Sequence, residues 1–194
     1  MRLLIATTNP GKITEISSLL SYGSVELVTP SDIGLHLDVD ETGSTYRENA
    51  EIKALAFSQA SNLPVLSDDT GLEVEALGGL PGIRSARFVN SAHASDHDRR
   101  TLLLKKLAGK PRPWKARFIC VATLVIPGHS PISMEGECFG EIIPQERGEQ
   151  GFGYDSLFLV AGTQKTMAEL DLQEKNLISH RAKAVKALIP FIKQ

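Results

Sequence analysis

The stretch Leu63-Pro64-Val65-Leu66-Ser67-Asp68-Asp69-Thr70-Gly71 joins a short apolar run to two adjacent carboxylates. The apolar run predicts a buried strand, which places the two acids at its carboxyl end. Adjacent residues of a strand point to opposite faces of a sheet, so we expect Asp68 and Asp69 to have different roles. Carboxylates at the carboxyl end of a strand are well placed to hold a hard cation such as Mg²⁺. The alternative is an Asx turn with two solvated acids, and this stretch alone does not decide between the two.

The composition of the chain is typical of a globular protein without membrane segments. Its 194 residues are 42% hydrophobic and 23% charged, which suffices for one substantial core or two joined lobes. No apolar run is long enough to span a bilayer, and the apolar N-terminus is too short for a signal peptide. Cys120 and Cys138 lack a metal-binding spacing, so we expect reduced, structural thiols and a cytoplasmic location. The formal net charge of -2 predicts no broad nucleic-acid surface.

A strand, a turn and a helix open the chain. Leu3–Thr7 predicts the strand, and apolar residues recur at helical spacing from Ile13 to Leu20. Asn9 suits the N-cap position and Pro10 the first helical position. The free backbone N–H groups of such a helix start, together with the charge of Lys12, favour a phosphate. The Walker A spacing is absent, and a capped helix without a ligand is the alternative.

The next predicted helix, Thr45–Ala60, carries a lysine on its apolar face. At about 100° per residue, Lys53 falls on the same stripe as Ala50 and Phe57, with Asn49 beside it. An unpaired buried lysine is costly, so Lys53 should meet an anionic partner or reach a cleft. A snorkelling lysine or an internal salt bridge is the alternative. The acidic segment 38–43 before this helix is by default a solvated loop.

The second half of the chain predicts a hairpin, a glycine loop and two more helices. The elements expected there are a helix at Asp96–Leu107 capped by Ser95, strands at Arg117–Pro127 and Ile132–Ile143, a loop at Gln150–Asp155, a strand at Leu157–Val160, and a last helix after Ser179. Glycines in the loop allow close backbone approach to a ligand, and Phe152 and Tyr154 offer flat faces for stacking. No internal repeat or linker interrupts the chain, so we interpret residues 1–194 as a single domain of two lobes.

These parts together describe a site for a polyphosphate ester that carries a flat base. The helix start with Lys12, the inward Lys53, the acidic pair and the aromatic glycine loop suit metal-assisted hydrolysis at phosphorus. The sequence has no nucleophilic-serine elbow and no cysteine–histidine setting, so water is the expected attacking group.

Five motifs in order resemble the inosine/xanthosine triphosphate pyrophosphatase family. They are Thr7-Thr8-Asn9-Pro10-Gly11-Lys12, Ser67-Asp68-Asp69-Thr70-Gly71-Leu72, Gly82-Ile83-Arg84-Ser85-Ala86-Arg87, Gly151-Phe152-Gly153-Tyr154-Asp155 and Ser179-His180-Arg181. The resemblance implies an elongated α/β fold, with a long mixed β-sheet, flanking helices and two lobes around a central cleft. It further implies a homodimer that uses Mg²⁺ to hydrolyse ITP, dITP and XTP to the monophosphate and pyrophosphate, clearing them from the nucleotide pool.

The same resemblance assigns roles to individual residues. Asp69 would be the general base and a metal ligand, Glu41 a second metal ligand, and Lys53 a catalytic cation that neutralises phosphate charge. The implied substrate-binding residues are Thr7, Thr8, Asn9, Pro10, Gly11 and Lys12 for the triphosphate, Phe152, Gly153, Tyr154 and Asp155 for the base and sugar, and Lys175, His180 and Arg181 for the purine edge. Thr70 would also touch the substrate. Asp68 receives no role beyond a supporting one.

A few positions depart from the family pattern, and two rival functions stay open. Thr70 stands where serine is usual, and Arg84 and Phe88 replace expected tyrosines. These changes affect loop shape and dimer contacts more than the reaction. One rival is a pyrophosphatase for other modified nucleotides. The other is a nucleotide-binding sensor without turnover.

Overall fold

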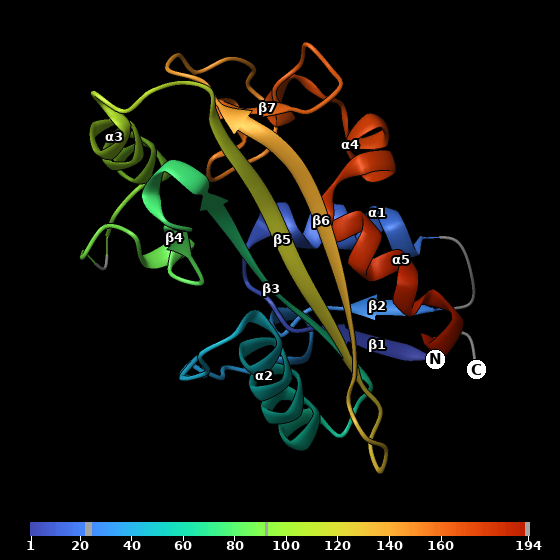
Figure 1. The fold of residues 1–194 in the computed structure, drawn as a ribbon. Coiled ribbons are helices and arrows are strands. Elements are labelled where there is room, and N and C mark those ends of the chain that lie inside the picture. Colours follow the sequence, from blue (N-terminus) through green and yellow to red (C-terminus); the bar gives the residue numbers. More distant parts are fainter. Residues whose placement is uncertain (22–24, 92, 193–194) are drawn as a thin grey trace. The chain divides into compact units, whose positions relative to one another are not determined.

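A mixed β-sheet carries the fold, and its strands follow the order β2-β1-β3-β5-β6-β7, with β4 paired to β3. The computed structural model describes residues 1–21, 25–91 and 93–192. The strands are β1 (Arg2–Ile5), β2 (Glu26–Val28), β3 (Val65–Val74), β4 (Pro81–Gly82), β5 (Trp114–Val125), β6 (Ile132–Ile142) and β7 (Phe158–Val160) (Figure 1). Strand β1 is parallel to β2 and β3, whereas β3–β4 and β6–β7 are antiparallel. The predicted α/β class with a mixed sheet is confirmed.

The helices are α1 (Pro10–Leu20), α2 (Tyr46–Ser61), α3 (Asp96–Leu107), α4 (Leu172–Ile178) and α5 (His180–Ile192). Short 3-10 turns occur at Ser31–Ile33, Glu75–Leu77, Ser85–Arg87, Asp155–Leu157 and Met167–Glu169. The caps predicted at Asn9 and Ser95 are confirmed, since each side chain accepts an N–H of the following first turn. Thr45, expected as the first residue of the second helix, caps α2 in the same way. Helix α4 was not predicted, because its 7 residues are too few for a helical repeat of apolar positions to be recognised.

The chain folds as two compact units. Unit 1 comprises residues 1–69, 120–136 and 179–194, and unit 2 comprises residues 70–119 and 137–178. Strands β3, β5 and β6 contribute residues to both. Within the part of the chain that the structure describes, no helix is long and apolar enough to cross a membrane.

In unit 1, helices cover both faces of the sheet. Leu3 and Ile5 of β1 pack with apolar residues of α1 and α5, whereas the intervening Leu4 packs with Ala54 and Phe57 of α2. The alternation follows from the two-residue period of a strand. A strand of unit 1 therefore sends successive side chains to α1 and α5 on one side and to α2 on the other.

The acidic pair lies inside β3, not at a strand end. The sequence predicts that this strand ends at Leu66, because two carboxylates follow. That prediction is wrong, since β3 continues through the pair to Val74. Leu66 packs on the side of α1 and α5, and Val65 packs on the side of α2. Asp68 shares the direction of Leu66, and Asp69 shares that of Val65. Two buried acids are tolerated in mid-strand because each finds polar partners on its own side.

Unit 2 is built around one apolar cluster. Residues of α3, β5, β6 and β7 contribute to it, among them Leu103, Phe118, Cys138 and Phe158. The rings of Phe118 and Phe158 pack with their centroids 4.5 Å apart. Cys138 here and Cys120 in unit 1 are buried thiols.

Candidate active site

Asp68 is the centre of a buried ionic network in unit 1. Its carboxylate accepts from the Nε of Arg181 at 3.1 Å and lies 2.9 Å from the Nζ of Lys12. Arg181 also donates to Glu15 of α1. Asp68 and Arg181 are each 1% exposed, and Glu15 is also buried. A role for Asp68, which the sequence left open, follows from these contacts: it anchors Lys12 of α1 and Arg181 of α5 to the same strand.

This network controls the ionisation of its members. Burial by itself would raise the pKa of Asp68, but the charges of Lys12, Arg181 and Lys53 outweigh burial and lower it. For Arg181 burial acts in the opposite direction and by itself would lower the pKa, but the nearby Asp68 and Glu15 carboxylates raise it. Both groups are therefore charged, and each is stabilised by its partners.

Asp69 faces the other side of β3 and meets α2. The Nδ2 of Asn49 donates to Asp69 Oδ2 at 3.2 Å, and the Oδ1 of Asn49 accepts from the N–H of Gly43 at 2.8 Å. Asn49 thus links Asp69 to the loop that carries Glu41. A Cβ at Gly43 would lie 2.7 Å from Asn49 Oδ1, so the loop approaches α2 this closely because residue 43 has no side chain.

Lys53 is paired with Glu41, and the internal salt bridge that the sequence allowed is present. Its Nζ lies 2.7 Å from Glu41 Oε1. Burial disfavours the charged amine, but the carboxylates of Asp68, Glu41 and Asp69 together raise the pKa of Lys53. A cation is thereby held among three acids.

The pKa of Asp69 is shifted in the opposite direction from that of Asp68. Burial raises it most, and the negative charge of Glu41 raises it further, against the lowering effects of Lys53, Asn49 and Lys12. A carboxylate with a raised pKa is a stronger base than an ordinary aspartate. The two neighbouring acids therefore differ: Asp68 is a structural anion, and Asp69 has the properties of a base.

Asp69 and Glu41 form a donor set that fits a hard divalent cation. Both offer carboxylate oxygens, and their mutual repulsion, seen in the pKa of Asp69, would be relieved by a bound cation. Within residues 1–21, 25–91 and 93–192, no group of three or more His, Cys, Asp and Glu side chains is gathered as a metal centre. Carboxylate oxygens are the ligands that a hard divalent cation takes, and water can complete its coordination.

The turn before α1 presents its polar groups at the surface of unit 1. Thr8 and Asn9 are exposed, and Thr7 is half-buried. The Oγ1 of Thr7 accepts from the N–H of Asn9 at 3.2 Å, and the Oδ1 of Asn9 accepts from the N–H of Lys12 at 3.0 Å. The helix start expected to bind a phosphate is thus formed and accessible, with Lys12 held beside it by Asp68.

In unit 2, the glycine loop is locked by Asp155 and Lys175. Asp155 Oδ2 accepts from the N–H of Phe152 at 3.0 Å and from the Nζ of Lys175 at 2.7 Å. The same Nζ lies 5.4 Å from the centroid of the Phe152 ring, within cation–π distance. Gly151 has a φ of +76°, and a Cβ there would lie 2.1 Å from Asp155 Oδ2. The fold of the loop therefore requires glycine at residue 151.

Phe152 and Tyr154 have different environments, which corrects the expectation that both rings are available for stacking. Phe152 is half-buried. Tyr154 is 4% exposed, packs in the apolar cluster of unit 2 and donates its hydroxyl to Ser85 O at 2.9 Å. Burial raises the pKa of this hydroxyl, which stays protonated. Tyr154 anchors the loop, and Phe152 is its accessible ring.

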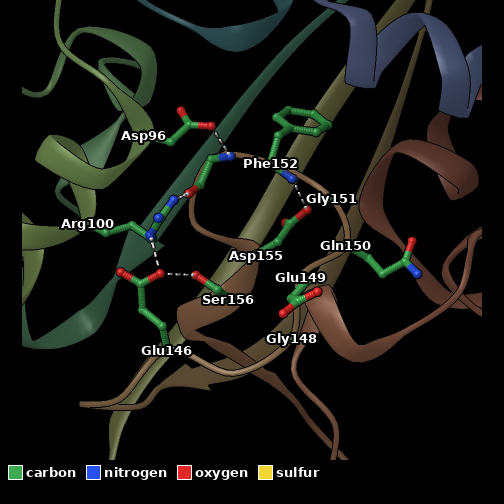
Figure 2. Close-up of a pocket in the computed structure, with 11 residues that line it drawn as sticks. Asp96, Arg100, Glu146, Gly148, Glu149, Gln150, Gly151, Phe152, Asp155 and Ser156 are labelled. Carbon is green, nitrogen blue, oxygen red and sulfur yellow. Dashed lines mark hydrogen bonds and ion pairs between the residues drawn. The ribbon is translucent and has the colours of Figure 1, made fainter.

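A polar pocket of about 240 Å³ adjoins this loop (Figure 2). Its lining residues come from α3 and the segment 146–156, and they are Asp96, Arg100, Glu146, Gly148, Glu149, Gln150, Gly151, Phe152, Gly153, Asp155 and Ser156.

Comparison with known proteins identifies the family of this chain. The model of the Ham1 family matches residues 3–191. The chain belongs to the Ham1 family. It is 46% identical to the "dITP/XTP pyrophosphatase" of Geobacillus kaustophilus, with 96% of this chain and 91% of that protein covered. It is 43% identical to a protein of the same name from Thermus thermophilus, over 100% and 92% of the two chains.

Solved Ham1 structures share the fold. The Staphylococcus aureus Ham1 protein is 38% identical with a TM-score of 0.87, and 100% of this chain and 98% of that chain are covered. A HAM1 protein from Coxiella burnetii is 37% identical with a TM-score of 0.88 at the same coverage. The resemblance read from five sequence motifs is thereby confirmed.

Sequence reasoning missed three polar residues in this member of the Ham1 family. Glu15 is a buried partner of Arg181, Asn49 connects Asp69 with the Glu41 loop, and Asp96 binds the glycine loop through Gly153. A signal was present for Asn49, which falls beside Lys53 on the inner stripe of α2. Glu15 and Asp96 gave none, because charged residues within a helix are ordinarily solvated.

Proposed function

We propose that this protein hydrolyses the deaminated purine nucleoside triphosphates ITP, dITP and XTP to the nucleoside monophosphate and pyrophosphate. The observation that carries the proposal is Asp69, a buried carboxylate with a raised pKa, set beside Glu41 and Lys53. Membership of the Ham1 family, with full-length relatives named dITP/XTP pyrophosphatases, supports the choice of substrate.

In this proposal Asp69 is the general base. It takes a proton from the water that attacks the α-phosphorus, a task that its raised pKa favours. Asn49 orients the carboxylate through its hydrogen bond to Oδ2. Asp69 and Glu41 would hold Mg²⁺, which when bound supplies positive charge that stabilises the phosphates and the leaving pyrophosphate.

Phosphate recognition falls to the turn before α1 and to Lys53. Thr7, Thr8, Asn9, Pro10, Gly11 and Lys12 form the proposed triphosphate-binding segment, with N–H groups at a helix start. Lys53 has a raised pKa and stays charged, so it offsets phosphate charge throughout the reaction.

Base recognition is assigned to the glycine loop and to hydrogen-bond donors of polar side chains. Thr70, Phe152, Gly153, Tyr154 and Asp155 would position the nucleoside, with Phe152 as the stacking ring. Lys175, whose Nζ lies 5.4 Å from the Phe152 ring, would offer a donor to the purine edge. The resemblance adds His180 to this role. Arg181 is 1% exposed and is bound to Asp68 and Glu15, so it belongs to the buried network of unit 1 and is not proposed as a base contact. Hypoxanthine and xanthine carry a 6-oxo acceptor where adenine has an amino donor. A donor left unpaired by adenine would cost about 1–3 kcal/mol per buried group, which disfavours ATP.

The proposed setting is a cytoplasmic homodimer that does not bind nucleic acid. The reduced state of Cys120 and Cys138 fits a cytoplasmic location. The dimer is taken from the family resemblance. The mass of the purified protein, measured by light scattering, tests whether the protein is a dimer.

A rate panel tests the function. Pyrophosphate release from ITP, XTP, dUTP, GTP and ATP should be fastest for ITP and XTP, and it should stop when a chelator removes divalent ions and resume when Mg²⁺ is added back. If pyrophosphate were released fastest from dUTP, the rival function, a pyrophosphatase for other modified nucleotides, would be favoured. Stoichiometric binding of ITP without release would favour the sensor.

Lys53→Met is expected to lower kcat/KM for ITP by about 10- to 100-fold, because a positive charge that acts on the phosphates is lost. Steady-state kinetics measure the effect. Arg47→Met is the matched control, since Arg47 lies on the same helix with a half-exposed side chain. Equal rates for both variants would remove Lys53 from the proposed machinery.

A further inference from the structure

Two side chains of α3 hold Gly153 of the glycine loop from both sides. Asp96 Oδ2 accepts from the N–H of Gly153 at 2.7 Å, and Arg100 Nη1 donates to the carbonyl oxygen of Gly153 at 2.9 Å. Figure 2 shows both contacts, with Asp96 and Arg100 reaching from the helix to the loop. The two residues are four apart, one turn of α3, and so lie on the same face of the helix. They fix the peptide groups before and after one glycine.

Each of these side chains is itself held by a further ion pair. Arg99 of the same helix donates to Asp96, and Arg100 Nε lies 2.9 Å from Glu146 Oε2. Glu146 also accepts from the hydroxyl of Ser156 at 3.0 Å. Burial alone would raise the pKa of Asp96, but the hydrogen bonds from Arg99 and from the Gly153 N–H outweigh it and lower the pKa. Asp96 therefore binds Gly153 as a carboxylate, and bonds to a charged group are stronger than neutral ones.

Gly153, the residue held by Asp96 and Arg100, directly follows Phe152, so its backbone angles affect the direction of the Phe152 ring. Gly153 has a φ of +63°, and glycine without restraint samples a wide range of backbone angles. On its C-terminal side Tyr154 is anchored in the apolar cluster. On its N-terminal side Phe152 is half-buried, with its N–H donated to Asp155 Oδ2 and its ring 5.4 Å from Lys175 Nζ. Rotation about Gly153 would change the direction of Phe152 relative to the buried Tyr154.

We infer that Asp96 and Arg100 are positioning residues, which set the Phe152 ring for the nucleobase by fixing both peptide groups of Gly153. The inference rests on the proposed function, because it concerns the base that the loop would bind. Neither residue touches the reacting phosphates in this scheme, so they act on binding and leave the chemical step unaffected.

Kinetics with ITP separate this role from a general effect on folding. Asp96→Ala and Arg100→Gln are each expected to raise KM about tenfold and to change kcat by less than about threefold, the size expected for one lost charge-assisted hydrogen bond. Asp96→Asn keeps an acceptor oxygen and should restore KM to within about threefold of the wild-type value.

Asp98→Ala is the matched control. Asp98 closes the capping box with Ser95 at the start of α3, so its loss weakens the same helix. It makes no contact with Gly153 among those described above, and KM should stay at the wild-type value. An equal rise of KM in Asp98→Ala and Asp96→Ala would show that only the stability of α3 matters, which would overturn the inference.

Hydrogen exchange gives a readout that is independent of activity. In the ligand-free protein the Gly153 amide should exchange about tenfold faster or more in Asp96→Ala than in the wild type, and it should be unchanged in Asp98→Ala. Unchanged protection together with unchanged KM in Asp96→Ala overturns the inference. If the wild-type protein releases no pyrophosphate from any triphosphate, the proposed function fails, whereas faster exchange in Asp96→Ala would still establish the restraint on Gly153.

Discussion

Asp69→Asn is expected to lower kcat for ITP by about 10²-fold or more, the low end of general-base contributions. The change removes the proton acceptor and one carboxylate of the proposed metal site, while the side chain keeps its size. Asn49 can still donate to the oxygen of an asparagine at residue 69, so the local structure should survive. Single-turnover kinetics at saturating ITP and Mg²⁺ measure the effect on the chemical step.

Glu73→Gln is the control for Asp69→Asn, since Glu73 is a carboxylate of the same strand whose partner is Arg117. Its kcat should stay within about threefold of the wild type, because Glu73 has no part in the proposed reaction and a partly exposed ion pair contributes little. Turnover of Asp69→Asn close to that of Glu73→Gln would contradict the assignment of Asp69 as the base.

Arg181→Met is expected to lower the free energy of unfolding by about 3 kcal/mol or more. Arg181 is 1% exposed and binds two buried carboxylates, Asp68 and Glu15. Methionine fills part of the volume but leaves both acids without their shared cation. Burying an uncompensated charge is far more costly than losing an exposed ion pair, so the effect should be large. Equilibrium unfolding in urea measures it.

The comparison for Arg181→Met is Arg117→Met. Arg117 also binds two carboxylates, Glu73 and Glu137, but its side chain is 38% exposed. Water replaces the lost partner there, and the expected loss is below about 1 kcal/mol. In the Arg181→Met background, Glu15→Gln should recover part of the lost stability by removing one buried charge. Equal destabilisation by Arg181→Met and Arg117→Met would contradict the buried network.

Local sequence signals predicted most of the helices. The Asn9 and Ser95 caps act within one turn, so residue types and short spacings suffice to recognise them. The position of Lys53 on an apolar stripe also predicted that it would meet an anionic partner or reach a cleft, and Glu41 is an anionic partner. The wrong end for β3 came from the same reasoning, since two acids in mid-strand look unfavourable until their partners are known.

The partners themselves are distant in sequence. Asp68 meets Arg181 across 113 residues, and Gly153 meets Asp96 across 57. Nothing local to Glu15 or Asp96 distinguishes either from a solvated acid on a helix. Their roles arise from which elements pack together.

The sequence by itself determined the α/β class, the helix starts, the family motifs and the opposite directions of Asp68 and Asp69. These depend on short-range periodicity and capping, or on an ordered set of motifs. The tertiary structure alone decided that Asp68 is a structural anion and that Asp69 has the raised pKa of a base. Asp68 is the more deeply buried of the two and yet its pKa is lowered, so the difference comes from neighbours. Lys12 and Arg181 on one side of β3 outweigh desolvation, whereas on the other side Lys53 and Asn49 do not outweigh desolvation and the charge of Glu41.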